Sequence, residues 1–151
     1  MRTVLFVCTG NTCRSPMAEA IARHSLRQPD GSLNPDVLVV SAGLHAGQGV
    51  PVTPETITAL EARGIEHRGT SKSVTAEMIR KADAVFTMTD QHVEGARELV
   101  ADDPAQHAKI SRLDPEGDIE DPIGMGQESY DAVADRMLEV IPRRLEELLA
   151  K

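Results

Sequence analysis

A cysteine and an arginine stand six positions apart near the start of the chain, at Cys8 and Arg14. A cysteine thiolate is a strong nucleophile, and an arginine side chain grips two phosphate oxygens with its planar fork. Together they indicate a loop that binds a phosphoryl group while the cysteine attacks phosphorus. Such an attack leaves a phosphocysteine, which water then hydrolyses.

The residues around this pair suit a loop that wraps around an anion. Gly10 and Asn11 tolerate left-handed backbone, which lets successive N–H groups point at one site. Pro16 favours a helix start, and a helix N-terminus adds a positive field that favours a thiolate. We expect Ser15 to donate a hydrogen bond to that thiolate. The expected substrate-binding set is Thr9, Gly10, Asn11, Thr12, Cys13, Arg14 and Ser15.

A bare pair of Cys and Arg at this spacing is weak evidence, because a buried cysteine and a solvated arginine often occur so by chance. Here the apolar run 3–7 before the loop, the Gly-Asn pair within it and the Ser-Pro step after it all agree. The agreement favours the catalytic interpretation over the structural one.

Strand and helix patterns alternate along the chain. Short apolar runs predict strands at 3–7, 37–40, 84–88 and 109–113, and helical patterns cover 16–26, 54–64, 74–81, 90–100 and 127–149, with a long acidic loop at 114–126. This order predicts an α/β fold of three layers (αβα), with a four-stranded parallel sheet in one domain over residues 1–151. Ligands of such sheets bind at the carboxyl ends of the strands, where residues 8–15 lie.

Composition excludes several classes of partner. Lys and Arg total 16 against 24 Asp and Glu, so the formal charge of −8 argues against binding nucleic acid or an anionic membrane. No run approaches the ~20 apolar residues of a membrane span, and residues 4–7 are too short for a signal core of roughly 7–15. We expect a cytoplasmic monomer. The five histidines show no metal spacing, so we expect no metal and no cofactor.

The run Val4 to Ala22 resembles the low-molecular-weight protein tyrosine phosphatase family. The similarity extends to Ser41-Ala42-Gly43, to Met88-Thr89 and to Asp121-Pro122 followed by Tyr130. The resemblance implies a four-stranded parallel sheet flanked by helices. It also implies Cys8 as nucleophile, Arg14 as phosphate ligand and an aspartate of an Asp-Pro pair as general acid, acting on phosphorylated proteins.

Two Asp-Pro pairs compete for the role of general acid. The resemblance places the acid shortly before the last helix, with a tyrosine about nine positions on, which selects Asp121 over Asp114. Asp118 is a neighbour that lacks the motif. The alternative is that Asp121 is a turn residue, as Asp before Pro often is.

The scarcity of aromatic residues bears on the expected substrate. The only aromatic residues are Phe6, Phe86 and Tyr130, and Ile123 follows the Asp-Pro pair where the family commonly has a ring. A threonine at position 12 of the loop resembles the protein arginine phosphatase branch of the family. The Thr12 hydroxyl can hydrogen-bond to a guanidinium, whereas an aliphatic side chain would leave the guanidinium unpaired. We expect phosphoarginine. The alternative is a tyrosine phosphatase in which Thr12 is only a packing variant. The arginine phosphatase branch also often has an aromatic residue after the Asp-Pro pair, and Ile123 departs from that pattern.

Three supporting residues have open roles. Cys13 either forms a reversible disulfide with oxidised Cys8 or simply packs in the loop. Ser41 is expected to support the loop. The resemblance implies that His67 joins it through a network with Asn11, although the spacing of His67 fits the family pattern poorly.

Two other functions fit the same loop. An arsenate reductase needs further cysteines or an external thiol, and no cysteine lies beyond Cys13. A non-catalytic phosphate-binding module needs neither Cys8 nor Asp121. Both are therefore weaker interpretations than a phosphatase.

Overall fold

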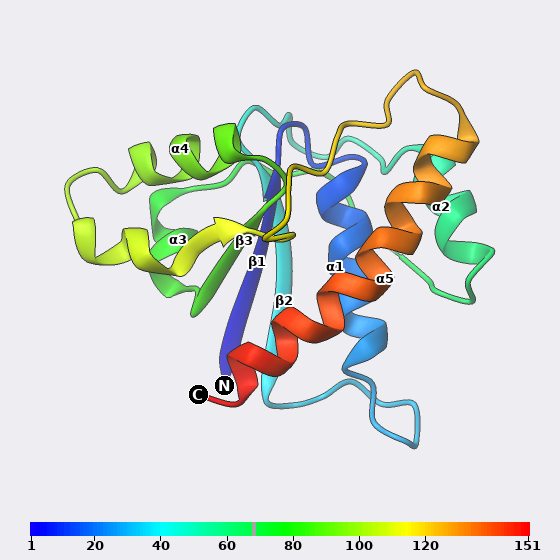
Figure 1. The fold of residues 1–151 in the computed structure, drawn as a ribbon, viewed down its shortest axis with the longest axis horizontal. Helices are drawn as coiled ribbons and strands as arrows, with labels where there is room; N and C mark the ends of the chain where they lie inside the picture. The colour runs from blue at the N-terminus through cyan, green and yellow to red at the C-terminus, as the bar shows by residue number, and fades with distance from the viewer. Residues whose placement is uncertain (68) are drawn as a thin grey trace.

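The computed structural model describes residues 1–67 and 69–151. Strands and helices alternate along the chain, as Figure 1 shows. The strands are β1 (Arg2–Cys8), β2 (Val37–Gly43), β3 (Ala84–Thr87) and β4 (Ile110–Arg112), and the helices are α1 (Arg14–Ser25), α2 (Pro54–Glu61), α3 (Ala76–Lys81), α4 (Asp90–Leu99), the 3₁₀ helix η1 (Pro104–Lys109) and α5 (Gln127–Leu149). None of the described helices is long and apolar enough to cross a membrane.

The four strands form one parallel sheet in the order β2-β1-β3-β4. The expected α/β fold with a parallel sheet is therefore confirmed. β1 lies inside the sheet, and its residues Val4 to Cys8 are all buried, which explains the continuous apolar run in the sequence. β2 is longer than predicted and continues to Gly43, while η1 replaces the start of the predicted fourth strand.

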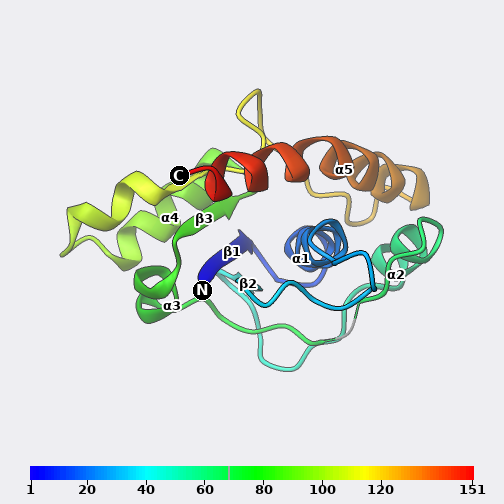
Figure 2. The same cartoon turned by 90° about the horizontal axis from the view of Figure 1, so that it is seen from below.

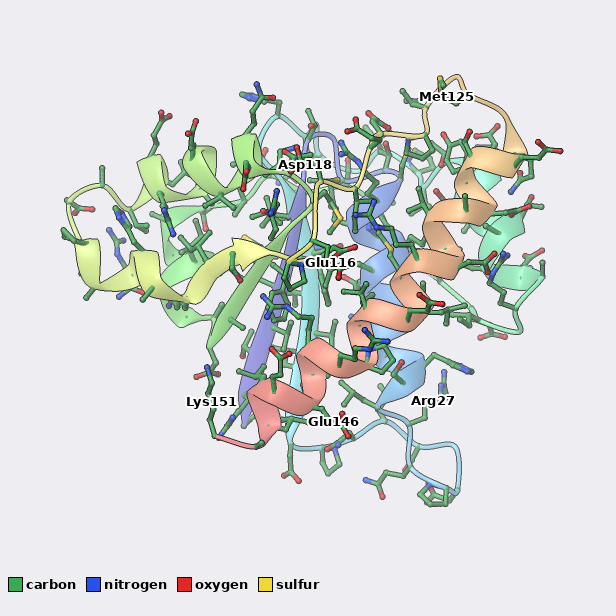
Figure 3. All side chains as sticks on the ribbon, in the orientation of Figure 1. Arg27, Glu116, Asp118, Met125, Glu146 and Lys151 are labelled. Carbon is green, nitrogen blue, oxygen red and sulfur yellow. The ribbon has the colours of Figure 1, made fainter. Side chains whose placement is uncertain are left out.

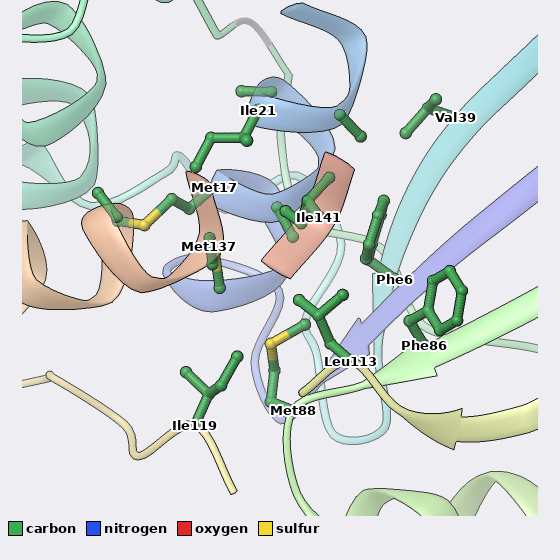
Figure 4. Close-up of a cluster of buried hydrophobic side chains, with 14 of the residues drawn as sticks. Phe6, Met17, Ile21, Val39, Phe86, Met88, Leu113, Ile119, Met137 and Ile141 are labelled. Atoms are coloured by element: carbon green, nitrogen blue, oxygen red, sulfur yellow. The ribbon is translucent and has the colours of Figure 1, made fainter. Parts of the chain in front are cut away.

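Helices cover both faces of the sheet. Alternate residues of β1 point to opposite faces, so Phe6 packs with α1 and α5 while Leu5 and Val7 pack with α3 and α4. Figure 2 shows α1 and α3 on opposite sides of β1. In Figure 4 Met17 of α1 and Ile141 of α5 belong to the same buried cluster as Phe6.

Most expected helix starts agree with the structure. The hydroxyls of Thr75 and Thr89 accept the N–H groups of the third residues of α3 and α4. Thr53 precedes α2, but its hydroxyl bonds to the Thr56 hydroxyl instead of a backbone N–H. α1 begins at Arg14, two residues earlier than Pro16, so Arg14 belongs to the first turn of the helix.

Candidate active site

The loop between β1 and α1 surrounds the sulfur of Cys8. Cys8 is the last residue of β1 and is only 2% exposed. Its Sγ lies 2.9 Å from the Ser15 hydroxyl and accepts the backbone N–H of Asn11 at 3.3 Å. Two donors facing one sulfur stabilise the thiolate, which is the nucleophilic form of a cysteine.

Asn11 holds the loop in its curved form. Its φ of 56° is the only positive φ outside glycine among the described residues, as the sequence predicts for a residue tolerant of left-handed backbone. Its Nδ2 donates to the hydroxyls of Ser15 at 2.8 Å and Ser41 at 3.0 Å, and its Oδ1 accepts the N–H of Lys72 at 3.0 Å. The Asn11 amide donates to the Ser15 oxygen, so the hydroxyl proton of Ser15 faces an acceptor, and the Cys8 sulfur at 2.9 Å is closer than the Ala42 carbonyl at 3.5 Å.

The end of β2 packs directly beneath the loop. A Cβ placed on Gly43 would lie 2.5 Å from the Thr9 carbonyl oxygen and 3.0 Å from the Asn11 nitrogen. The N–H groups of Leu44 and His45 donate to the carbonyls of Cys8 and Thr9 at 3.0 and 2.9 Å. The close approach requires glycine at position 43.

Arg14 and Asp121 meet at this loop, although they lie far apart in sequence. Arg14 is buried, and its Nη1 donates to the Ile119 carbonyl at 2.9 Å while its Nη2 lies 3.7 Å from Asp121 Oδ2. The Asp121 side chain is 43% exposed. Its Oδ1 also accepts the Ile123 N–H at 3.1 Å, so Asp121 is both a turn residue and a carboxylate beside Arg14.

The other two candidate aspartates have structural partners. Asp114 accepts the guanidinium of Arg136 at 2.7 Å and the N–H of Glu116 at 2.9 Å. Burial would raise the pKa of Asp114, but these two hydrogen bonds and the Arg136 charge hold it below the usual value. Asp118 accepts the Asp90 N–H at 3.0 Å. In Figure 3 Asp118 lies on the side of the molecule where the strands end.

Glu19 of α1 is a buried part of the site that the sequence analysis missed. It accepts the Ser41 hydroxyl at 3.0 Å, lies 3.0 Å from Arg23 and 3.5 Å from Nε2 of His67. Burial would raise its pKa, but the hydrogen bond from His67, the charge of Arg23 and the Ser41 hydroxyl together lower it. His67 therefore reaches Ser41 and Asn11 through Glu19, an intermediate that no local pattern indicates.

His92 is a second residue that the sequence analysis missed. It lies in the first turn of α4, and its Nε2 is 2.9 Å from the hydroxyl of Thr9 in the loop. Its pKa is lowered to about 4, mainly because the ring is buried and further because Arg14 is close. The ring is therefore neutral at physiological pH.

Cys13 is a free thiol inside the loop, as is Cys8. Its sulfur lies 3.6 Å from the Thr53 hydroxyl, 3.7 Å from the Tyr130 hydroxyl and 3.8 Å from the Thr12 hydroxyl. Burial and the contact with Cys13 raise the pKa of Tyr130 to about 12. These contacts fit a packing role, and a disulfide with Cys8 stays a prediction.

The three aromatic side chains, Phe6, Phe86 and Tyr130, are all buried. Phe6 and Phe86 pack together in the core with centroids 5.9 Å apart, and Tyr130 is buried. The side chain of Ile123, beyond Asp121, is exposed. Among the described residues no group of His, Cys, Asp and Glu is arranged to hold a metal ion.

Comparison with known proteins gives a family match and a close relative. Residues 3–151 match the family model described as low molecular weight phosphotyrosine protein phosphatase. The chain is 36% identical over 154 residues to a protein-arginine-phosphatase of Bacillus subtilis, an alignment that covers 98% of this chain and 97% of the relative.

Solved structures share the fold over nearly the whole chain. The YwlE arginine phosphatase from Geobacillus stearothermophilus superposes with a TM-score of 0.85 at 34% identity, covering 99% of this chain and 94% of that one. A low molecular weight protein tyrosine phosphatase from T. tengcongensis gives 0.83 at 37% identity, covering 97% and 99%. A YwlE arginine phosphatase with its active-site cysteine mutated to a phosphorylated serine gives 0.84 at 31% identity, covering 97% and 95%.

Proposed function

The chain belongs to the low molecular weight phosphotyrosine protein phosphatase family, and within this family we propose that it removes phosphate from phosphoarginine in proteins. The enzyme is a cysteine-dependent protein phosphatase, a hydrolase. The proposal concerns its substrate and the roles of Cys8, Arg14 and Asp121.

The observation that carries the substrate proposal is Thr12 in the phosphate loop. Its side chain is partly exposed, and among the described residues its hydroxyl makes only a 3.8 Å contact with the Cys13 sulfur. The hydroxyl is therefore available to a polar substrate group. A guanidinium bound there gains a hydrogen-bond acceptor that an aliphatic residue would not provide, and leaving it unpaired would cost affinity.

A polar group at the mouth supports the same substrate. Asp121 is partly exposed and lies next to Arg14, so a bound guanidinium can donate a hydrogen bond to the carbonyl oxygen of its carboxyl group. A phenol ring, in contrast, would find no aromatic partner, because the rings of this chain are buried in the core. The Bacillus subtilis relative that aligns over 98% of this chain is named a protein-arginine-phosphatase.

The first chemical step forms a phosphocysteine. The Cys8 thiolate, held by Ser15 and the Asn11 N–H, attacks phosphorus in line. A sulfur–phosphorus bond forms while the phosphorus–nitrogen bond breaks, and Asp121 in its acid form protonates the departing nitrogen. Arg14 and the loop N–H groups stabilise the charge on the equatorial oxygens. The relative with a phosphorylated active-site serine fits this step.

The second step releases phosphate. Asp121, now ionised, takes a proton from a water molecule, whose oxygen attacks phosphorus. The phosphorus–sulfur bond breaks, and inorganic phosphate and the Cys8 thiolate are formed. One carboxylate thus acts first as an acid and then as a base.

We further propose that the enzyme works as a monomer in the cytoplasm. Every side chain in the proposed mechanism comes from one chain, so the site needs no second copy. The nucleophilic thiol must stay reduced, which suits a reducing compartment.

The test compares phosphoarginine and phosphotyrosine peptides of otherwise identical sequence. We expect a higher kcat/KM for phosphoarginine, and we expect Thr12→Ile to move the preference toward phosphotyrosine by at least about tenfold. Thr12→Ser retains the hydroxyl and should retain the preference. Wild-type preference for phosphotyrosine would contradict the proposal and make this chain a tyrosine phosphatase. Absence of turnover on either peptide and on p-nitrophenyl phosphate would contradict the catalytic roles themselves.

A further inference from the structure

His92 is a buried titratable residue that the proposed mechanism does not use. It is only 6% exposed and belongs to the first turn of α4, next to the end of β3. Its ring bridges two elements, since Nδ1 lies 3.2 Å from the backbone nitrogen of Thr89 and Nε2 lies 2.9 Å from the hydroxyl oxygen of Thr9.

The hydrogen bonds define which ring nitrogen carries the proton. The Thr89 N–H points at Nδ1, so Nδ1 accepts and carries no proton. In a neutral imidazole the proton must then be on Nε2, which donates to the Thr9 hydroxyl. The nearby charge of Arg14 disfavours a second proton on the ring, while Asp118 and Asp121 favour one and His45 opposes it.

This contact connects the phosphate loop to α4, whereas the other hydrogen bonds of the loop connect it to β2 and to the residues around it. Asn11 ties the loop to β2 through Ser41, and the Thr12 carbonyl accepts the N–H of Thr53 before α2. Among the described residues, His92 makes the one side-chain hydrogen bond from α4 to this loop. Thr9 directly follows Cys8, so the tether acts on the first turn of the loop.

We propose that His92 is a positioning residue that holds Thr9, and with it the first turn of the phosphate loop, in the geometry that the transition state requires. Loop N–H groups stabilise the transition state only if they are already aimed at the developing charge. A looser first turn weakens this stabilisation more than it weakens ground-state binding. The proposal rests on the phosphatase activity alone and not on the preference for phosphoarginine.

Two substitutions of His92 each retain one of its two contacts. In His92→Asn the short amide can still accept the Thr89 N–H but does not reach Thr9, whereas in His92→Gln the longer amide can still donate to Thr9. With p-nitrophenyl phosphate we expect His92→Asn to lower kcat about fivefold with KM within twofold of wild type. We expect His92→Gln to retain kcat within about twofold while the protein unfolds at a lower urea concentration.

A variant with low kcat and a different variant with low stability together distinguish a positioning role from a purely structural one. A residue with a purely structural role would lose activity in parallel with stability, so the Gln variant would be the less active one. Gln91→Ala, an exposed neighbour in the same helical turn, serves as the control and should match wild type in both measurements. Full kcat in folded His92→Asn would overturn the proposal.

A double-mutant cycle with Thr9 provides the second measurement. Thr9→Val removes the hydroxyl and should also lower kcat about fivefold. If His92 acts through Thr9, then His92→Asn combined with Thr9→Val should have a kcat no lower than about fivefold below wild type. A product of the two effects, about twenty-five-fold, would show independent roles and overturn the proposal.

Discussion

The Asn11 amide and the Ser41 hydroxyl are joined by a hydrogen bond of 3.0 Å that connects the phosphate loop to β2. The connection continues into the molecule, because Ser41 donates to the buried Glu19. It also continues toward Cys8, the proposed nucleophile, because Asn11 donates to Ser15, whose hydroxyl lies 2.9 Å from the Cys8 sulfur. A chain of polar contacts thus links the buried carboxylate of Glu19 to the thiol of Cys8.

Replacing Asn11 tests this chain of contacts. Asn11→Ala removes three hydrogen bonds, two of them fully buried, and places alanine at a φ of 56°. We expect the free energy of unfolding to fall by about 3 kcal/mol and kcat for p-nitrophenyl phosphate to fall at least about tenfold. Asn11→Gly also loses the hydrogen bonds but avoids the strain, so urea unfolding should show it about 1 kcal/mol more stable than the alanine variant. Equal stability of the two variants would contradict the strain.

Gly43 tests the close packing beneath the loop. A Cβ at this position would lie 2.5 Å from the Thr9 carbonyl oxygen, so Gly43→Ala must displace the loop. We expect a loss of about 2 kcal/mol in urea unfolding and a lower kcat. In Gly47→Ala the nearest contact of the new Cβ is 3.5 Å, to a methyl of Val50, so this control should stay within about 0.5 kcal/mol of wild type. If Gly43→Ala changed neither the stability nor kcat, the loop would have room to move away from the added methyl group.

His92 makes stability depend on pH. Its pKa is lowered from 6.5 to about 4 in the folded protein, chiefly by burial, so the unfolded chain takes up the proton first as the pH falls. The contribution of neutral His92 is complete above about pH 6.5 and is lost between there and about pH 4. Lowering the pH from 7.5 to 5 should therefore reduce the free energy of unfolding by about 2 kcal/mol through His92 alone.

Urea unfolding at several pH values measures this effect. His92→Gln should lose that part of the pH dependence, while His24→Gln, at an exposed position, should behave as wild type does. If His92→Gln keeps the whole wild-type pH dependence, other groups are responsible for it.

The sequence predicted the parts of the site that are close together along the chain. The loop from Cys8 to Ser15 follows a buried strand and enters a helix, so its own residue types describe it. Its place at the end of β1 follows from the parallel sheet, because ligands of such sheets bind at the carboxyl ends of the strands. The glycine at position 43 was noticed only through the family resemblance, yet its physical reason is the approach to Thr9.

The missed residues act across large separations in sequence. Glu19 lies on a helix where a glutamate usually faces solvent, and only the packing of α1 against β2 buries it beside Ser41. His92 follows an ordinary N-cap threonine, and its second contact needs β1 and β3 to be neighbours in the sheet. Helical and strand periodicities carry no information on either partner.

Asp121 and Asp114 offer a direct test of the general acid. Both precede proline, but Asp121 lies beside Arg14 while Asp114 is paired with Arg136. A general acid matters most when the leaving group is a poor one, so Asp121→Asn should lower kcat/KM about a hundredfold on phenyl phosphate and clearly less on p-nitrophenyl phosphate. Asp114→Asn removes a structural partner, so it should lower stability by about 1 to 2 kcal/mol with no dependence on the leaving group.

The ratio of kcat/KM on the two esters distinguishes the two aspartates, because kcat/KM reports the first step, in which the leaving group departs, and not the hydrolysis of the common phosphocysteine. Because both substrates present the same phosphoryl group to Cys8 and Arg14, a fault in phosphate binding lowers both rates and leaves the ratio unchanged. Only loss of the proton donor changes the ratio, since p-nitrophenolate leaves readily without a proton and phenolate does not. A changed ratio in Asp114→Asn together with an unchanged one in Asp121→Asn would move the general acid to Asp114. An unchanged ratio in both variants would assign the proton to neither residue.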